Sequence, residues 1–238
     1  MPETQSNFRF LVKALVLCCV FFWVSQHMTV AYPATVPPMV NPTEKSSELL
    51  PCRIVSLAPS LTETLFALGL NDRIVGVTDY CSWPKEAKSK AKIGGFIDPG
   101  LEAIVGLRPD LVVLLPDHRE TLARLEALGL NCVTVKQYTV SDILQTITDL
   151  GETCGVASQA RSLRQAVEAR IAKVEKHVLT ASRPKVAISV GREVTGTRLD
   201  QACLVGPKSY LHELLIKAGG QNVLDERVMT YPTVAAEG

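Results

Sequence analysis

The sequence predicts an α/β protein with two lobes joined by one long helix, the second lobe being partial. Three observations support this fold class. Short apolar segments alternate with helical patterns in residues 52–155, residues 156–183 have one continuous helical periodicity, and a new strand–helix alternation occupies residues 184–238. Strands that alternate with helices through short connections are typical of a largely parallel sheet covered by helices. Each lobe is therefore expected to be Rossmann-like.

Short apolar runs predict the strands of the first lobe. Leu111 to Leu115 is uninterrupted and bounded by Pro109 and Pro116, a pattern typical of a parallel strand that is buried on both faces. Turn-forming residues separate it from its neighbours. The expected strands cover residues 53–57, 74–77, 111–115 and 132–135.

Helices are predicted between these strands. Ser60 and Glu63 have the spacing of a capping box at the start of the first helix. Asp98 is the expected N-cap of the next helix, with Pro99 in its first turn. A third helix is closed by Gly129, because glycine adopts the left-handed conformation that ends helices.

The segment 156–183 is predicted to be a single helix that connects the lobes. Its apolar residues are spaced four, four, three and four apart, and about 25 helical residues would extend nearly 40 Å. Pro184 ends this helix. A strand at 186–190 and a helix at 210–218 then begin the second lobe. The periodic apolar residues are Leu163, Val167, Ile171, Val174 and Val178.

Residues 1–31 are predicted to be a signal peptide or an N-terminal anchor. Arg9 and Lys13 precede an apolar run, residues 14–24, which is shorter than the roughly 20 residues that span a membrane. Residues 29–31 offer a small-residue cleavage site. Two alternatives stay open, an uncleaved anchor and a lipoprotein signal at Cys18 or Cys19. All three predict an exported protein, periplasmic or extracytoplasmic, which is free or held at the membrane.

Residues 32–51 read as a Pro- and Ser-rich tether without periodicity. The whole chain is 47% hydrophobic and 21% charged with a formal net charge of +1, as in ordinary globular proteins. This balance argues against nucleic acid as a partner. The five cysteines after residue 31 are odd in number and include no CxxC pair, which argues against zinc and leaves one disulfide open. They are Cys52, Cys81, Cys132, Cys154 and Cys203.

Several ordered motifs resemble one family of transport receptors. They include the opening strand and turn RIVSLAPSLTE, the loop VTDYCSWP, the segment GGF followed by LEAIVGLRPDLV, and GPKSYLHELL followed by AGGQNV. They are similar to the helical-backbone metal-receptor class of periplasmic binding proteins, which serve ferric-siderophore and cobalamin ABC importers. The resemblance covers residues 52–238 and implies a monomeric receptor, not an enzyme, whose partners are a permease and its ATPase.

The resemblance also implies which residues act. The ligand is a metal chelate held between the lobes, carried as cargo, so that no cofactor is expected. Glu102 and Glu237 occupy the positions of the two acidic residues that dock on permease arginines. The alternative is that Glu102 complements a helix N-terminus and that Glu237 is a solvated surface charge. Membrane contact would occur only through the signal or anchor and through the permease.

Ligand-binding candidates follow strands of both lobes. Tyr80 is the strongest, because open α/β sheets bind ligands at the carboxyl ends of their strands and a tyrosine ring offers apolar area with a polar tip. Trp83 lies in the same loop, and Phe96 matches an aromatic contact of cobalamin-binding members. Both have the alternative of packing under a loop. His118 is a candidate at the edge of the cleft, and Arg192, just after a second-lobe strand, is a candidate partner for an anionic chelate or a surface charge.

Competing interpretations are limited by missing motifs. Leu115 stands where cobalamin binders present a tryptophan, which leaves cobalamin and ferric siderophores both open. The sequence has no glycine-rich phosphate loop and no GxSxG elbow, so an enzyme is not favoured. The scattered histidines argue against a naked-metal site. A receptor that serves a sensor instead of an importer stays open, and the short segment after Pro184 predicts an incomplete second lobe.

Overall fold

The computed structural model describes residues 50–195, 198–224 and 229–235. The predicted signal or anchor, and the predicted tether up to residue 49, lie outside these residues. Within the described ranges, no helix combines the length and the apolar character needed to cross a membrane.

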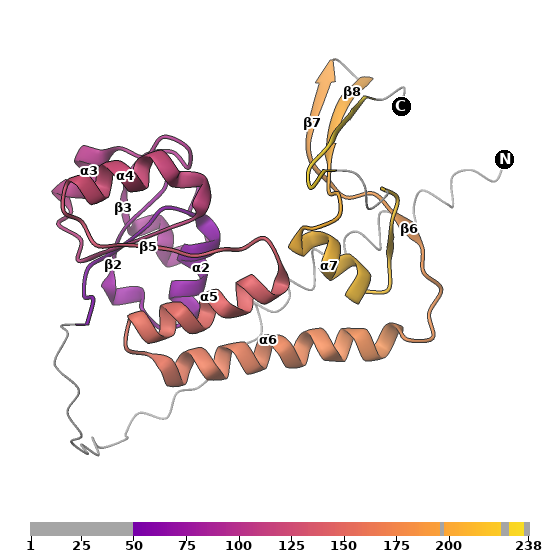
Figure 1. The fold of residues 1–238 in the computed structure, drawn as a ribbon, viewed down its shortest axis with the longest axis horizontal. Helices are drawn as coiled ribbons and strands as arrows, with labels where there is room; N and C mark the ends of the chain where they lie inside the picture. Colours follow the sequence, from indigo (N-terminus) through magenta and orange to yellow (C-terminus); the bar gives the residue numbers. More distant parts are fainter. Residues whose placement is uncertain (1–49, 196–197, 225–228, 236–238) are drawn as a thin grey trace. The chain divides into compact units, whose positions relative to one another are not determined.

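A five-stranded parallel sheet forms the first lobe (Figure 1). Its order is β3-β2-β1-β4-β5, and each neighbouring pair is parallel. The chain moves outward from β1 to β3 and then crosses back to β4, so the direction of winding reverses between β1 and β4. Such a reversal opens a crevice at the carboxyl ends of the strands. The strands are β1 Ile54–Ser56, β2 Ile74–Val77, β3 Ala91–Lys92, β4 Leu111–Leu114 and β5 Cys132–Thr134.

Helices cover both faces of this sheet. Helices α2 (Pro59–Ala67) and α5 (Val140–Thr153) pack on one face, while α3 (Leu101–Gly106) and α4 (Arg119–Ala127) pack on the other (Figure 1). The two central strands send alternate residues into each core. All four residues of β4 are fully buried, which explains why its sequence is an apolar run without polar alternation.

Two predicted helix starts are wrong. Helix α2 begins at Pro59 with Ala58 as its N-cap, so Ser60 lies inside the first turn and forms no capping box with Glu63. Proline suits this first position because its fixed φ is already helical and its missing N–H would have no helical partner. Helix α3 begins only at Leu101, after Gly100 as N-cap without a side-chain bond. Asp98 therefore caps nothing.

The sequence reasoning missed α5, although its capping signal is present. Thr139 Oγ1 accepts from the Asp142 N–H at 3.0 Å, and Asp142 Oδ2 accepts from the Thr139 N–H at 3.0 Å. This reciprocal pair satisfies two backbone donors at the start of the helix.

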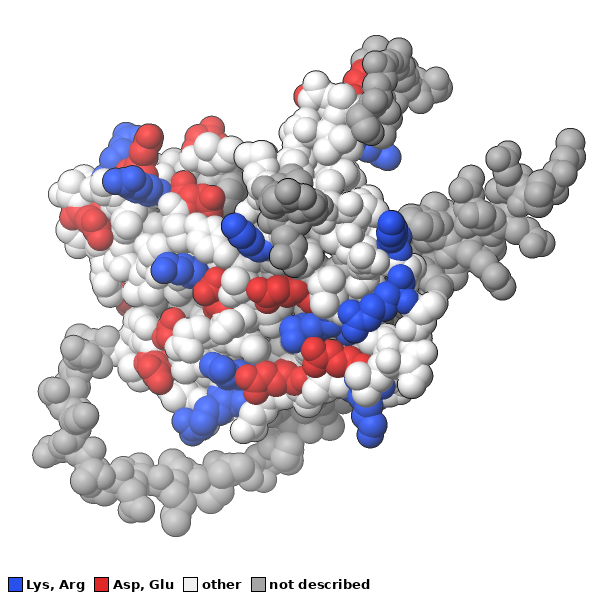
Figure 2. Space-filling model, turned by 45° about the vertical axis from the view of Figure 1, so that its right-hand side comes forward, with Lys and Arg blue, Asp and Glu red and all other residues white. Residues whose placement is uncertain are grey.

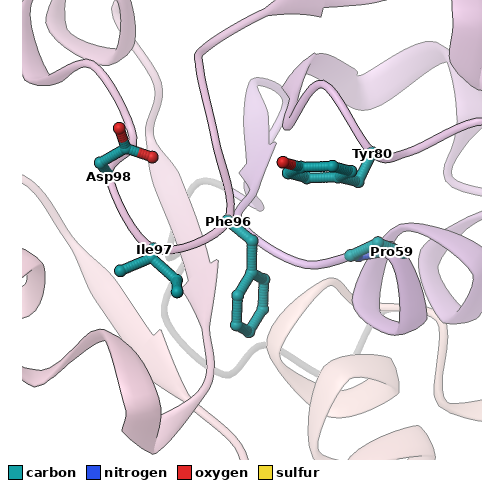
Figure 3. A pocket seen from close by; sticks show the side chains of 5 residues that line it. All are labelled: Pro59, Tyr80, Phe96, Ile97 and Asp98. Carbon is teal, nitrogen blue, oxygen red and sulfur yellow. The ribbon is translucent and has the colours of Figure 1, made fainter. Parts of the chain in front are cut away.

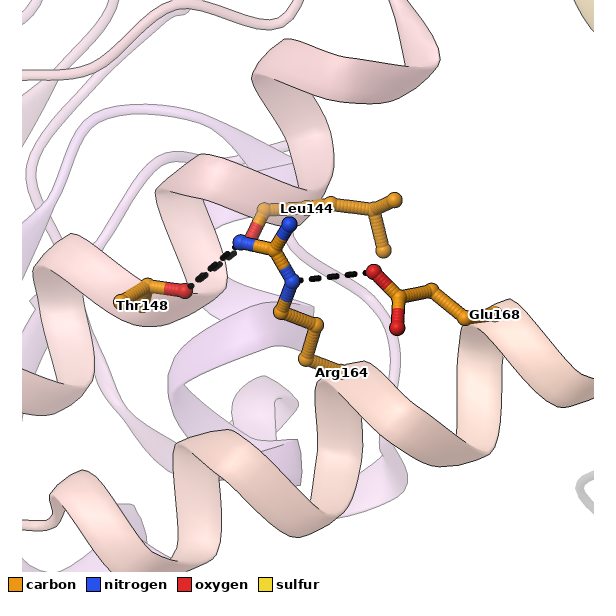
Figure 4. A network of polar contacts seen from close by, with 4 residues as sticks. All are labelled: Leu144, Thr148, Arg164 and Glu168. Atoms are coloured by element: carbon orange, nitrogen blue, oxygen red, sulfur yellow. Dashed lines mark hydrogen bonds and ion pairs between the residues drawn. The ribbon is translucent and has the colours of Figure 1, made fainter.

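The long helix α6 spans Ala157–Val178, 22 residues, and packs against α5. A chain of polar contacts joins the two helices (Figure 4). Thr148 Oγ1 donates to the Leu144 carbonyl and accepts from Arg164 Nη1 at 3.2 Å, while Arg164 Nε donates to Glu168 at 3.0 Å. One arginine therefore ties the connecting helix to the first lobe. The predicted long helix is confirmed.

The second lobe contains helix α7 (Tyr210–Lys217), with Ser209 as N-cap, and two small sheets. The predicted strand at 186–190 is wrong in detail, because the chain instead forms the two-residue strand β6 and the seven-residue strand β7 there. One sheet is a parallel pair and the other is antiparallel with the order β10-β8-β7. The strands are β6 Lys185–Val186, β7 Ser189–Thr195, β8 Arg198–Leu204, β9 Gln221–Asn222 and β10 Thr233–Ala235.

All five cysteines in the described residues are free thiols. Cys52 is exposed, whereas Cys154 is buried and its burial raises the pKa of its thiol to about 11. Because the thiolate is the reactive form, we expect a brief maleimide pulse at pH 8 to modify Cys52 and spare Cys154. Peptide mapping by mass spectrometry measures both sites, and guanidinium-unfolded protein is the control. Equal labelling of both thiols in the native protein would contradict the packing around α5.

Candidate functional site

The carboxyl edge of the parallel sheet holds an open pocket of about 440 Å³ (Figure 3). Its walls come from the segments that follow β1, β2 and β3, which lie side by side in the sheet. The structure thus brings together two of the predicted ligand contacts, Tyr80 and Phe96. Pro59, Ile97 and Asp98 complete the lining.

The pocket exposes large apolar side chains to solvent. Tyr80 is 68% exposed and Ile97 is 86% exposed. In Figure 3 the hydroxyl end of Tyr80 lies on the side of the Phe96–Ile97 loop, and the Phe96 ring extends away from that loop. The Phe96 ring is partly buried and packs against the core of the lobe. Exposed aromatic and aliphatic groups gathered in a concave site are typical of a surface that awaits a partly apolar ligand.

Polar contacts hold both ends of the Tyr80 loop. The Cys81 N–H donates to the Thr78 carbonyl at 3.1 Å, and Thr62 Oγ1 lies 3.2 Å from Cys81 Sγ. Lys92 Nζ donates to the carbonyls of Thr78 and Cys81 at 3.3 and 3.0 Å. Because both loop ends are fixed, Tyr80 is presented on a rigid support although its own ring is exposed. Rigid presentation lowers the entropy lost on binding.

His118 lies behind the pocket, not in its lining. It is 3% exposed, its Nε2 is 2.8 Å from the Phe96 carbonyl, and its Nδ1 accepts from the Leu115 N–H at 3.2 Å. Its ring also meets the Phe96 ring edge-on, with 4.7 Å between centroids. Both nitrogens of this buried ring are thus engaged within the protein. Contact of His118 with a ligand stays a prediction.

Two further candidates lie apart from this pocket. Trp83 shares the Tyr80 loop and is 41% exposed, but it does not line the pocket. Arg192 was expected just after a strand, and this is wrong because β7 continues to Thr195 and places Arg192 within the strand, where it is exposed. Their ligand contacts stay predictions.

The structure describes one of the two predicted docking residues, Glu102. Glu102 is exposed in the first turn of α3, and no other described residue forms a hydrogen bond or ion pair with its carboxylate. Its position six residues after Phe96 places it next to the pocket segment along the chain. Glu237 lies outside the described residues.

Sequence reasoning missed Pro59, Ile97 and Asp98 as pocket residues. Asp98 was interpreted as a helix cap and Pro59 as part of a strand-and-turn motif, which hid their places in the segments that follow β3 and β1. The signal that could have found Ile97 is its apolar side chain between glycines and Asp98-Pro99, in a segment too short to bury it.

Charged and titratable side chains contribute little to the carboxyl edge of the parallel sheet. Among the described residues, no group of three or more His, Cys, Asp or Glu is arranged to hold a metal ion. Partial burial raises the pKa of Glu63, one turn after Pro59 on α2. Figure 2 shows Lys and Arg interspersed with Asp and Glu on the face in view.

Comparison with known proteins identifies the family. Residues 54–237 match the family model described as periplasmic binding protein. The chain belongs to this family. A vitamin B12-binding protein of Vibrio parahaemolyticus is 26% identical over 187 residues, which are 78% of this chain and 66% of that protein. An uncharacterized ABC transporter substrate-binding lipoprotein of Bacillus subtilis is 29% identical over 164 residues, 67% of this chain and 52% of the relative.

Solved structures show the same fold. The periplasmic heme-binding protein RhuT of Roseiflexus has a TM-score of 0.68 and 26% identity, covering 78% of this chain and 71% of that one. The vitamin B12-binding protein BtuF of Vibrio cholerae has a TM-score of 0.67 and 22% identity, covering 79% and 71%. The predicted α/β fold class and the resemblance to metal-chelate receptors are confirmed.

The quoted relatives are named as binding proteins, and one of them as the substrate-binding lipoprotein of an ABC transporter, so the family is one of binding proteins and not of enzymes. The chain spans about half to two thirds of the length of the curated relatives quoted above. Its ligand, partners and transport activity are therefore proposals.

Proposed function

We propose that this periplasmic binding protein is the substrate-binding component of an ABC importer, which captures a metal chelate between its lobes and delivers it to a permease. The observation that supports this most is the pocket at the carboxyl edge of the parallel sheet, where Tyr80 and Phe96 converge. We also propose that the protein is an exported monomer and that its partners are the permease and the ATPase of that importer.

The shape and chemistry of the pocket favour a large chelate. Its lining is mainly apolar and open, so it can take one face of a ligand while the rest of that ligand meets another surface. Corrin and catechol chelates offer such flat apolar faces with a polar rim, and an aromatic ring packs well against them. We propose cobalamin or a ferric siderophore. Haem belongs in the same test because some structural relatives are named for it.

Tryptophan fluorescence tests the proposal directly. Residues 32–238 contain one tryptophan, Trp83, in the loop that presents Tyr80. Titration of this part of the chain with cyanocobalamin, haemin and several ferric siderophores, with absorbance controls for inner-filter quenching, should give saturable quenching by one chelate at nanomolar to micromolar concentration. Absence of binding by every chelate, confirmed by calorimetry, would overturn the proposed ligand class.

Tyr80→Ala should raise the Kd for that chelate by about fivefold, because it removes one ring contact worth about 1 kcal/mol. Tyr80→Phe keeps the ring and should change the Kd less than about threefold unless the hydroxyl binds the ligand. Leu128→Ala is the matched control, since Leu128 is also an exposed apolar residue, 57% exposed, but ends α4. Calorimetry measures all three. An unchanged Kd for Tyr80→Ala would remove Tyr80 from the site.

A further inference from the structure

The loop between β3 and α3 is fixed at its base. The Gly100 N–H donates to the Ile93 carbonyl at 2.7 Å, the Asp79 N–H donates to the Gly94 carbonyl at 2.9 Å, and Gly94 forms a bridge with Pro99. These contacts close the neck of the loop but do not reach its tip. The tip, residues 95–98, carries Phe96 and two other pocket residues.

One side chain holds the tip. Among the described residues, the bond between His118 Nε2 and the Phe96 carbonyl, 2.8 Å long, is the only hydrogen bond that ties residues 95–98 to another loop of the lobe. The edge-on contact between the two rings supports the same residue, with an interplanar angle of 66°. The position of Phe96 therefore depends on a residue that follows β4, at the other side of the winding reversal.

The turn after β4 orients the imidazole for this task. The Leu115 N–H donates to His118 Nδ1 at 3.2 Å, while the His118 N–H donates to the Leu115 carbonyl at 3.0 Å. Because Nδ1 accepts, the proton of the neutral ring lies on Nε2, and Nε2 donates to Phe96. The hydrogen bond from the Leu115 N–H thus favours the tautomer that can donate to the Phe96 carbonyl.

We propose that His118 is a positioning residue for ligand binding, which holds the Phe96 loop tip in the geometry that the chelate meets. The inference rests on the proposed function, since it concerns the same pocket. A buried histidine in an ordinary core role would stabilise the lobe without any special effect on the loop tip. The two interpretations differ in which of the two ring bonds matters for affinity.

Two substitutions separate these bonds. Asparagine places its oxygen near the position of Nδ1, so His118→Asn can still accept from the Leu115 N–H but cannot reach Phe96. Glutamine places its amide nitrogen near the position of Nε2, so His118→Gln can still donate to the Phe96 carbonyl but leaves Leu115 without its acceptor. Both variants keep a polar group of similar size in the buried site, and thermal unfolding measures their stability.

The expected result is a split in affinity. His118→Asn should raise the Kd for the bound chelate about five- to tenfold, the effect of one lost hydrogen bond, whereas His118→Gln should stay within about twofold of the original protein. In a Phe96→Ala background, His118→Asn should cost little further affinity, because the residue acts through Phe96. Equal Kd values for both His118 variants, or an undiminished cost in the Phe96→Ala background, would overturn the proposal.

Backbone ¹⁵N relaxation measured by NMR tests the same proposal without ligand. His118→Asn should lower the order parameters of residues 95–98 below those of the original protein, while His118→Gln should leave them unchanged. If no chelate binds the original protein, the proposed ligand class fails, and the order parameters still decide whether His118 holds the loop. Unchanged order parameters at residues 95–98 in His118→Asn would refute the positioning role even where a chelate binds.

Discussion

Replacing Glu102 with Arg is expected to reduce delivery of the chelate to its permease by at least about tenfold and to leave the Kd for the chelate unchanged. The exposed carboxylate on α3 has no partner among the described residues, so it is available to an arginine of another protein. Reversing the charge turns attraction into repulsion, and such changes in a protein interface cost several kcal/mol. Combined reversal of Glu102 and Glu237 should abolish uptake.

Uptake of labelled chelate by cells that lack the original gene and carry each variant measures this effect. Glu120→Arg is the matched control, because Glu120 is also exposed in the first turn of a helix, α4. Its reversal removes the same favourable interaction with a helix N-terminus. If Glu120→Arg reduces uptake as strongly as Glu102→Arg, or if Glu102→Arg weakens chelate binding, the docking role is wrong.

Leu65→Ala is expected to lower the free energy of unfolding by about 3 kcal/mol, because truncating a buried leucine removes apolar contacts and leaves a cavity. Leu65 is fully buried on α2, within the core that joins this helix to β1 and β4. Since α2 begins at Pro59, which lines the pocket, loss of this packing also loosens the support of the site.

Urea unfolding followed by circular dichroism measures the effect. Leu128→Ala removes the same atoms from a residue that is 57% exposed, and its cost should stay below about 0.5 kcal/mol. Similar losses in the two variants would mean that α2 is not packed on the sheet as described.

The pattern of elements in the first lobe was largely predictable, because each signal is local. The apolar run at β4, the strand at β2 and the helix ended by Gly129 depend on residues that are close in the chain. The N-cap of α2 was predicted two residues late, at Ser60 instead of Ala58, since the capping preference of Ser60 competed with the stronger fit of Pro59 to the first helical position. Helix α5 was missed although Thr139 and Asp142 have the spacing of a capping box.

The candidate site was predictable only in part. Tyr80 follows a strand whose carboxyl end is visible in the sequence, so its place in the pocket could be predicted. Asp98 could not, because its place in the pocket depends on how a loop crosses the sheet edge. Arg192 was misplaced because nothing local shows that β7 continues to Thr195.

By itself, the sequence determined the alternation of strands and helices, the long helix and the motifs of a periplasmic binding protein, since periodicity and motifs are properties of neighbouring residues. Only the tertiary structure decided that the winding reverses between β1 and β4 and that His118 supports Phe96. These residues are 22 positions apart and follow different strands. Their contact exists because the order of strands in the sheet, which no local pattern encodes, brings the two loops together.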